Sequence, residues 1–550
     1  MKPLSALFLK SLIFLFLASI TGHDLFSQPD IYADYYYRIY IRDKGGGNQE
    51  PVAVYELLSD RAIERRNRNG ISSDSFDTPI HQPYIDSLRS MGLRVHCRSK
   101  WLNTVTVASP TIIDNQIVEN ISFIDSILLV RPPLSTKGFT ESAKPEIEEG
   151  LTVAPPYYWQ IQLSRGDFLH DMGMRGNNKL IAVLDGGYTY ADIIESLTTL
   201  HNEGRIGYTY DFILGNEHVY NYSSHGTAIL SILAGDLPGS LTGSAPGASY
   251  LLLRTEDGFS EYPIEEDLWV AAAEFADSAG ADIITSSLGY SLFDDPAMNY
   301  TWSQLDGKST FVSIGAGIAF SRGIIVVNSA GNARDDPWLY VTSPADSEGV
   351  ISAGAVDAYG KISKFSSAGP TYDGRVKPDI VALGVDVSYQ TQPGSIRTGN
   401  GTSFACPIIS GLTACLMQSF PDADIHDIKK ALMVGADKYL NPDTLYGYGL
   451  ANFHNAFVFL NEQMITDEHI ITFYPNPSGE SLQFRTNESI DRLHIRIFSV
   501  NGTLLYESDL FNISDPVTRI RGFENLAAGI YIIRASTGQK SWQEKIIKLK

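Results

Sequence analysis

Cysteine is nearly absent from this chain, with three residues among 550. So few cysteines exclude a disulfide scaffold and a cysteine-rich zinc module. Lysine and arginine are also scarce, 42 against 63 aspartates and glutamates, which gives a net charge of −21. Because a nucleic-acid backbone requires a basic face, this balance argues against a general nucleic-acid binder. Hydrophobic residues make up 43% of the chain, so a packed core is expected.

Long apolar runs are missing as well, apart from one near the N-terminus. Residues 1–27 combine a charged start, an apolar stretch that is densest over 12–18, and a polar exit. This order is typical of a secretion signal. A membrane anchor is the alternative, but the run is shorter than the about 20 residues that a spanning helix needs. We therefore expect an exported protein without a transmembrane anchor in its mature form.

Two segments precede the long central part of the chain. Residues 31–135 contain strand patterns such as Tyr35–Ile41 and helix starts near Ser59 and Gln82, which predict a small α+β unit. Residues 136–156 contain proline, glycine and acidic residues without a period. Such composition is typical of an exposed linker, where proteases cut.

Residues 157–460, the middle segment, have a different pattern. Short runs that are apolar throughout alternate with helical stretches, at 179–185, 250–254, 282–285, 323–328 and 350–354. Strands that are buried on both faces by helices have this pattern. We predict an α/β domain with a doubly wound, mostly parallel sheet.

Residues 467–550 return to alternating strands. Leu493–Phe498 and Leu504–Tyr506 flank Asn501-Gly502. An Asn-Gly dipeptide between alternating runs is the strongest short signal for a β-hairpin. We predict a small β-sandwich that has its own core.

Three polar residues of the middle segment lie where strands end or helices begin. Asp185 ends an apolar run, His225 begins an apolar helical stretch, and Ser403 lies at another helix start. We expect Pro407 in the first turn of that helix, where no intrahelical bond is lost. A serine attacks well when a base removes its proton; a histidine can be that base, and a carboxylate can orient it. Because strand ends and helix starts converge on one crevice of such a sheet, the three residues predict nucleophilic catalysis.

Asn332 follows the apolar run 323–328 and is expected at the same edge of the sheet. An amide side chain beside the free first-turn amides of the Ser403 helix would bind a tetrahedral oxyanion. Each short motif alone is common in turns and caps. The order Asp, His, Asn, Ser in one sheet is much more specific.

The middle segment resembles the subtilisin-like serine proteases, the subtilases. The similarity rests on Val183-Leu-Asp-Gly-Gly187, His225-Gly-Thr227, Ser287-Leu-Gly289, Ser329-Ala-Gly-Asn332, Asp373-Gly-Arg-Val-Lys-Pro-Asp379 and Gly401-Thr-Ser-Phe-Ala-Cys-Pro407. It implies a catalytic triad of Asp185, His225 and Ser403. It also implies that Asn332 is the oxyanion donor.

The resemblance extends to substrate binding. Ser287, Leu288 and Gly289 match the segment that pairs with the substrate backbone, where an added peptide is held by main-chain hydrogen bonds. Ala330 and Gly331, with Gly289, suggest small wall residues that suit an apolar side chain before the cut. The leading prediction is a secreted serine endopeptidase that acts on peptides or proteins through an acyl-enzyme.

Gly186 departs from the family pattern, which usually has Ser or Thr after the catalytic aspartate. The missing hydroxyl removes one hydrogen bond to Asp185 and supports an alternative function, an impaired subtilase-like scaffold that binds peptides. An ester hydrolase is a further alternative. The Gly-x-Ser-x-Gly frame of esterases is absent around Ser403.

The flanking segments resemble known companions of this catalytic domain. Residues 31–135 are similar to propeptides of exported bacterial subtilases, which inhibit and assist folding; an ordinary N-terminal binding domain is the alternative. Residues 467–550, with Phe473-Tyr-Pro-Asn-Pro-Ser-Gly479, resemble the C-terminal sorting domain of the type IX secretion system. An adhesive or carbohydrate-binding sandwich is the alternative there. The resemblances imply the secretion machinery as a partner, and a secreted or cell-surface protein that travels by way of the periplasm.

The expected chemistry requires no cofactor. Many subtilases bind structural calcium, and acidic loop residues such as Asp335 and Asp336 could hold it. No Asp-x-Asp-x-Asp-Gly spacing identifies its ligands, so the metal site is unknown. Cys97, Cys406 and Cys415 are predicted to be buried thiols.

Overall fold

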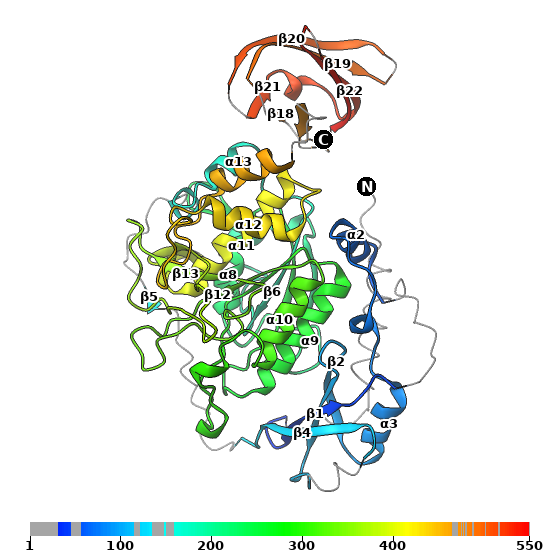
Figure 1. The fold of residues 1–550 in the computed structure, drawn as a ribbon, viewed down its shortest axis with the longest axis vertical. Helices are drawn as coiled ribbons and strands as arrows, with labels where there is room; N and C mark the ends of the chain where they lie inside the picture. The colour runs from blue at the N-terminus through cyan, green and yellow to red at the C-terminus, as the bar shows by residue number, and fades with distance from the viewer. Residues whose placement is uncertain are drawn as a thin grey trace.

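The computed structural model describes residues 31–45, 57–114, 121–134, 148–149, 159–464 and 471–548, the last range without 475, 477, 479, 480, 487, 488, 501, 515, 516 and 539. The expected secretion signal and most of the expected linker lie outside the described residues. Figure 1 shows the strand-rich C-terminal part at one end of the molecule, beyond helix α13 (Phe453–Met464). The N-terminal part, in blue, lies along the side that carries helices α9 (Ile264–Ala279) and α10 (Phe311–Ser321).

A parallel sheet of seven strands forms the centre of the middle segment, in the order β14-β13-β12-β11-β6-β10-β7. Its strands are β6 (Leu180–Asp185), β7 (Ile206–Asp211), β10 (Ser249–Arg254), β11 (Ile283–Ser286), β12 (Ile325–Ser329), β13 (Val350–Val356) and β14 (Ile380–Leu383). The predicted doubly wound sheet is therefore confirmed. Its two edge strands, β7 and β14, were not expected from the sequence.

Helices cover both faces of this sheet, which explains why its strands are apolar throughout. Ile181 and Val183 of β6 pack into one core with α8 (His225–Ala234) and α11 (Thr402–Ser419). Ala182 and Leu184 of the same strand pack into a second core with α9 and α10. All four side chains are fully buried.

The order of the strands places a crevice at the centre of the sheet. From β6 the chain adds β7 and β10 on one side, and β11 to β14 on the other. Ligand sites of such sheets form where the order reverses, outside the carboxyl ends of the strands. Here that position lies beyond the ends of β6 and β11.

Shorter elements complete the middle segment: α5 (Trp159–Gln162), α6 (Asp167–Asp171), α7 (Thr198–Asn202), α12 (Ile425–Gly435), β8 (Asp236–Leu237), β9 (Leu241–Thr242), β15 (Val387–Gln392) and β16 (Ser395–Asn400). Helix α13 continues to Met464, four residues beyond the predicted end of the middle segment at residue 460. Phe453, Phe457 and Leu460 hold it against the core.

The N-terminal unit is the expected α+β fold. Its antiparallel sheet has the order β2 (Arg94–Ser99), β3 (Thr104–Ser109), β1 (Tyr35–Ile41) and β4 (Ile124–Arg131), with α2 (Asp60–Arg68) and α3 (Gln82–Ser90). The Ser59 hydroxyl caps α2 by accepting from the Ala62 amide, as Ser does at helix starts.

Buried ion pairs join the N-terminal unit to the acidic helix α9. Arg65 and Arg66 of α2 both bond to Asp277, and the Arg38 Nε lies 2.8 Å from Asp267 Oδ1. All five side chains are almost fully buried. Removing one partner would leave an uncompensated buried charge. The contact between the N-terminal unit and α9 therefore depends on each of these ion pairs.

The C-terminal unit is a sandwich of two antiparallel sheets. One has the order β17 (Ile471–Tyr474), β18 (Leu482–Thr486), β21 (Val517–Ile520), and the other β20 (Leu504–Ile513), β19 (Ile490–Ser499), β22 (Gly529–Ser536), β23 (Ser541–Lys548). It has its own core, as expected. It also touches the middle segment: Tyr474 packs beside Phe457, and the Arg485 guanidinium lies 4.7 Å from the centre of the Phe420 ring. The unit is therefore not fully independent.

No helix in the described part of the chain combines the length and the apolarity needed to cross a membrane.

Candidate active site

The structure brings Asp185 and His225 together beyond the end of β6. His225 is the first residue of α8, and its Nδ1 lies 2.9 Å from both carboxylate oxygens of Asp185. Asp185 is 1% exposed, whereas the His225 side chain is 25% exposed. Because an ionised carboxylate only accepts, Nδ1–H donates, and Nε2 is left as the basic nitrogen.

Backbone groups hold this pair in place. The Gly186 amide donates to Asp185 Oδ1 at 2.7 Å, so the main chain supplies a hydrogen bond to the carboxylate where residue 186 lacks a hydroxyl. The His225 amide donates to Ser223 Oγ at 3.1 Å. A Cβ added at Gly186 would lie 3.5 Å from the Cβ atoms of Glu256 and Ser223, an ordinary contact distance. Nothing around Gly186 therefore requires glycine.

Gly226 is different, because it allows α8 to approach β6 closely. A Cβ there would lie 2.4 Å from the Gly187 carbonyl oxygen and 3.0 Å from Asp185 Cβ. Any side chain at residue 226 would push the helix away from the strand. The glycine after His225 thus sets the distance between His225 and Asp185.

Arg254 ties together three segments around the pair. Its Nε donates to the Gly186 carbonyl at 3.0 Å, its Nη1 lies 2.7 Å from Asp211 Oδ2, and its guanidinium stacks 3.7 Å from the centre of the Tyr222 ring. Arg254 and Asp211 are buried. The sequence analysis missed this residue, since a single arginine at the end of an apolar run gives no sign of its partners.

Ser403 is the second residue of α11 and is partly buried. Its main-chain carbonyl accepts from Ser287 Oγ at 2.9 Å. The expectation that Pro407 lies in the first turn is wrong, because α11 begins at Thr402 and Pro407 lies inside it. Residue 407 would normally donate to the carbonyl of residue 403, and proline has no N–H. The carbonyl of Ser403 is therefore open to the Ser287 hydroxyl.

Asn332 lies beside the start of the same helix. Its Oδ1 accepts from the Thr402 amide at 2.9 Å and from Thr402 Oγ1 at 2.8 Å. These two donors identify the oxygen of the amide, so Nδ2 points the other way. A Cβ added at Gly401 would lie 3.6 Å from the Ser403 amide nitrogen and 3.7 Å from Asn332 Nδ2. The Ser403 amide and Asn332 Nδ2 therefore border one small space, which stays open because Gly401 has no side chain.

The predicted substrate-binding residues extend two neighbouring strands. Ser287, Leu288 and Gly289 follow β11, and the Leu288 carbonyl accepts from Asn328 Nδ2 at 2.8 Å. Ala330 and Gly331 follow β12, and the Gly331 amide donates to Thr402 Oγ1 at 3.2 Å. Both segments therefore reach the helix start that carries Ser403.

The three cysteines are buried and unpaired with one another, as predicted. Cys406 lies under β11 and β12, with its Sγ 3.4 Å from the Val327 carbonyl oxygen. Burial raises the pKa of Cys406 to about 11, so its thiol stays protonated at neutral pH. Cys406 is not a competing nucleophile.

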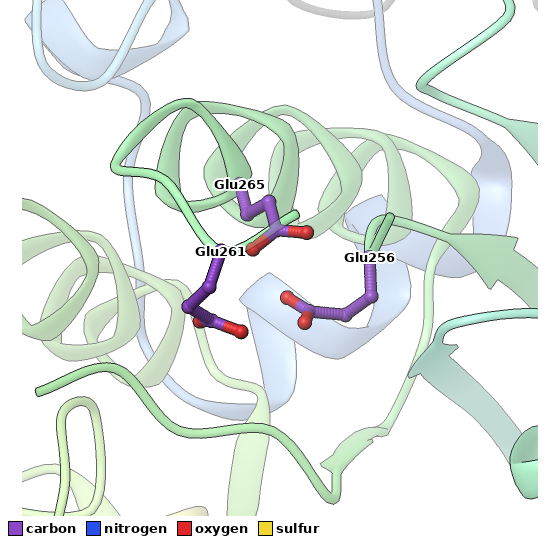
Figure 2. Close-up of side chains that lie close together, drawn as sticks. All are labelled: Glu256, Glu261 and Glu265. Atoms are coloured by element: carbon purple, nitrogen blue, oxygen red, sulfur yellow. The ribbon is translucent and has the colours of Figure 1, made fainter. Parts of the chain in front are cut away.

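Three carboxylates meet between β10 and the start of α9, as Figure 2 shows for Glu256, Glu261 and Glu265. Their ligand atoms lie within 4.8 Å of one another. Carboxylate oxygens suit calcium, but three atoms are fewer than the six to eight oxygens that calcium takes. Within the described residues this is the one such group, and the exposed Asp335 and Asp336 are not in it.

One short piece of the expected linker passes the site. The strand β5 (Glu148–Glu149) pairs antiparallel with β16, with Glu149 opposite Gly399 and Glu148 opposite Asn400. Asn400 lies three residues before Ser403. The backbone of residues 148 and 149 thus lies beside the strand that leads into the Ser403 helix.

Family models match three parts of the chain. Residues 176–449 match the subtilase family, residues 36–145 match the peptidase S8 propeptide domain of Bacteroidota, and residues 472–549 match a secretion system C-terminal sorting domain. The three matches correspond to the middle segment and its two flanking units. The matched C-terminal domain is a sorting domain of the type IX secretion system.

Several curated proteins are similar to this chain. The serine protease AprX of Bacillus subtilis is 31% identical over 314 residues, which cover 52% of this chain and 67% of AprX. The thermophilic serine proteinase of Bacillus sp. (strain AK1) is 27% identical over 369 residues, 64% of this chain and 82% of that protein. Subtilisin DY of Bacillus licheniformis is 27% identical over 301 residues, 54% of this chain and 97% of that protein.

Proposed function

Because the chain belongs to the subtilase family and is a serine-type endopeptidase, we propose that it cuts peptide bonds through an acyl-enzyme formed on Ser403. His225 removes the Ser403 proton and later delivers it to the leaving amine. Asp185 orients the imidazole through its Nδ1–H and stabilises the imidazolium. The observation that carries this proposal is the 2.9 Å contact of His225 Nδ1 with the Asp185 carboxylate, at the sheet crevice near the Ser403 helix.

Asn332 Nδ2 and the Ser403 amide are the proposed donors to the oxyanion. Both border the space beside Gly401, and Thr402 fixes the orientation of the Asn332 amide. We expect Asn332→Ala to lower kcat by about 10²–10³ with little change in KM, because the donor acts on charge that forms in the transition state. A change confined to KM would contradict this role.

The direct test is labelling and loss of activity at Ser403. A phosphonofluoridate probe should label Ser403 in the wild type, and Ser403→Ala should abolish casein digestion while the fold is retained. Ser419→Ala is a matched control on the same helix, because within the described part of the chain its hydroxyl bonds to the Cys415 carbonyl alone. Labelling of another residue, or full activity of Ser403→Ala, would overturn the triad. Peptide binding without turnover in the wild type would favour the impaired scaffold.

We further propose that the N-terminal unit inhibits the enzyme until the linker is cut between Arg131 and Pro156. The ion pairs with α9 and the pairing of β5 with β16 support this role. Residues 31–135 added in trans should inhibit the mature enzyme, and Arg38→Met should weaken this inhibition by at least about 10² because it leaves Asp267 buried without its partner. Arg89→Met is the control, because among the described residues the ion pair of Arg89 is with Asp86 of its own helix and not with α9. Full activity of the uncut precursor would refute the proposal.

The sorting domain indicates a secreted or cell-surface protein. We propose that the signal first directs export to the periplasm and that residues 467–550 then direct transport across the outer membrane. A chain ending near residue 465 should accumulate in the periplasm and still cut peptides once its N-terminal unit is removed. Because Tyr474 and Arg485 pack on the middle segment, this chain should also be measurably less stable. Normal secretion of the shortened chain would favour the adhesive sandwich instead.

A further inference from the structure

Two chain segments bond to the start of the Ser403 helix, and we call the space between them the gap. One side is the segment that follows β11, where Ser287 Oγ bonds to the Ser403 carbonyl. The other side is the segment that follows β12, where the Gly331 amide bonds to Thr402 Oγ1. Under the proposed function, we expect a peptide whose scissile carbonyl faces Ser403 to place the side chain before that carbonyl in this gap.

The side chain of Thr342 occupies the inner part of the gap. A Cβ added at Gly289, on one side, would lie 2.1 Å from Thr342 Oγ1. A Cβ added at Gly331, on the other side, would lie 3.1 Å from the same oxygen and 3.3 Å from Thr342 Cγ2. The two glycines have no side chains, and the Thr342 side chain fills the space between them.

The backbone around Thr342 is bonded to both sides, which fixes the position from which its side chain projects into the gap. The Thr342 amide donates to the Ala330 carbonyl at 3.1 Å. Its neighbour Ser343 exchanges two hydrogen bonds with Tyr290, at 2.8 and 3.1 Å. A substrate side chain cannot shift the Thr342 backbone without breaking these bonds.

The hydroxyl of Thr342 is buried and lacks a hydrogen-bond partner among the described residues. The residue is 7% exposed. A buried hydroxyl without a partner is costly, and such groups usually find one. A partner that arrives with the substrate would satisfy it.

We propose that Thr342 closes the pocket for the side chain before the scissile bond and restricts it to small, uncharged side chains, alanine and serine. Serine gains a hydrogen bond to Thr342 Oγ1, and large apolar or aromatic side chains find the space already filled. This inference rests on the proposed function. It narrows the apolar preference expected from the sequence.

The test uses peptides that differ only in the residue before the cut: alanine, serine or phenylalanine. The enzyme is the self-processed protein from the culture medium, and the phosphonofluoridate probe counts its active sites. We expect kcat/KM for alanine and serine to exceed that for phenylalanine by about 10² or more, since even one methylene is worth about 10–200-fold in a pocket. Thr342→Gly should raise the phenylalanine value by about 10–10² and change the alanine value little.

Thr342→Val is the matched variant, because it keeps the volume and removes the hydroxyl. It should still reject phenylalanine and lower the ratio of serine to alanine by about 5–10-fold, the value of one hydrogen bond. Equal cleavage after phenylalanine and alanine by the wild type would overturn the proposal, even where Thr342→Gly fails to fold. An unchanged ratio in a probe-labelled Thr342→Gly would also overturn it. A wild type that neither cuts any peptide nor is labelled at Ser403 would overturn the proposed function itself, and this inference with it.

Discussion

The Ser287 hydroxyl donates to the main-chain carbonyl of Ser403 at 2.9 Å, although 116 residues separate them. The helix leaves this carbonyl free because residue 407, whose N–H would bond to it, is a proline. A side chain from the β11 extension thus takes the place of a helix hydrogen bond. The proposed substrate-binding segment and the proposed nucleophile are joined by this contact.

The contact can be tested by removing the donor and then replacing it. We expect Ser287→Ala to lower kcat by about 3–10-fold and the free energy of unfolding by about 1 kcal/mol, because the Ser403 carbonyl loses its partner. Adding Pro407→Ala restores a helix N–H to the same carbonyl. Peptide kinetics and urea unfolding of both single variants and the double variant measure the coupling. A double variant that recovers nothing would show that the hydrogen bond has no such role.

Gly186 should tolerate a side chain. The nearest atoms to an added Cβ are at 3.5 Å, so we expect Gly186→Ser to keep kcat/KM within a few fold of the wild type and to fold normally. Gly226→Ser is the matched control, because its Cβ would clash with the Gly187 carbonyl and approach Asp185. We expect that variant to lose most activity. If Gly186→Ser instead restored activity to an inert wild type, the chain would be an impaired subtilase.

We expect Arg254 to affect the reaction rate because it holds the Gly186 carbonyl, which is next to Asp185 in the chain. Arg254→Met leaves Asp211 buried without its partner, so we expect a loss of about 3–5 kcal/mol in the free energy of unfolding. Arg254→Lys keeps the charge but not the fork that reaches Asp211 and the Gly186 carbonyl together. It should therefore retain most stability and lower kcat more than it raises KM.

A matched control for Arg254 is Arg492→Met, which breaks an ion pair in which the Arg492 side chain is 63% exposed. Exposed pairs contribute less than about 1 kcal/mol, so this variant should unfold like the wild type. Chemical unfolding and peptide kinetics compare the three variants. An Arg254→Lys variant whose KM alone changes would contradict a role in positioning Asp185.

His96 makes the stability of the N-terminal unit depend on pH. Its ring packs edge-on to Tyr36 at 5.1 Å, and burial, with the nearby Arg131 and Arg94, lowers its pKa from 6.5 to about 3. The unfolded chain takes up a proton below about 6.5, and the folded one does not. The stability due to neutral His96 is therefore full above pH 6.5 and is lost as the pH falls toward 3.

The measurement is urea unfolding of the Ser403→Ala chain, which cannot process itself if the proposed function holds. Between pH 7.5 and pH 5.5 we expect His96 to account for a loss of about 1 kcal/mol. His96→Gln should reduce the pH dependence by that amount, because glutamine does not titrate. An identical pH dependence in the two proteins would contradict the assignment to His96.

The sequence by itself determined the layers of the fold and the chain order of the candidate site. Runs such as 179–185 are apolar throughout because helices bury both faces of β6, so the pattern is visible without a structure. The edge strand β7 was missed because most of its residues are not buried and its polar residues interrupt the pattern. Asp185, His225, Asn332 and Ser403 could be singled out because short glycine-containing motifs surround them.

Only the tertiary structure decided what supports and shapes that site. The place of Pro407 depends on where α11 begins, and the bond from Ser287 to Ser403 depends on a strand brought beside that helix. Thr342 lies in an irregular loop with no motif, and its position between two glycines exists only after β11 and β12 are paired. Local patterns follow from the covalent chain and the burial of one element. Contacts between distant segments require the packed fold.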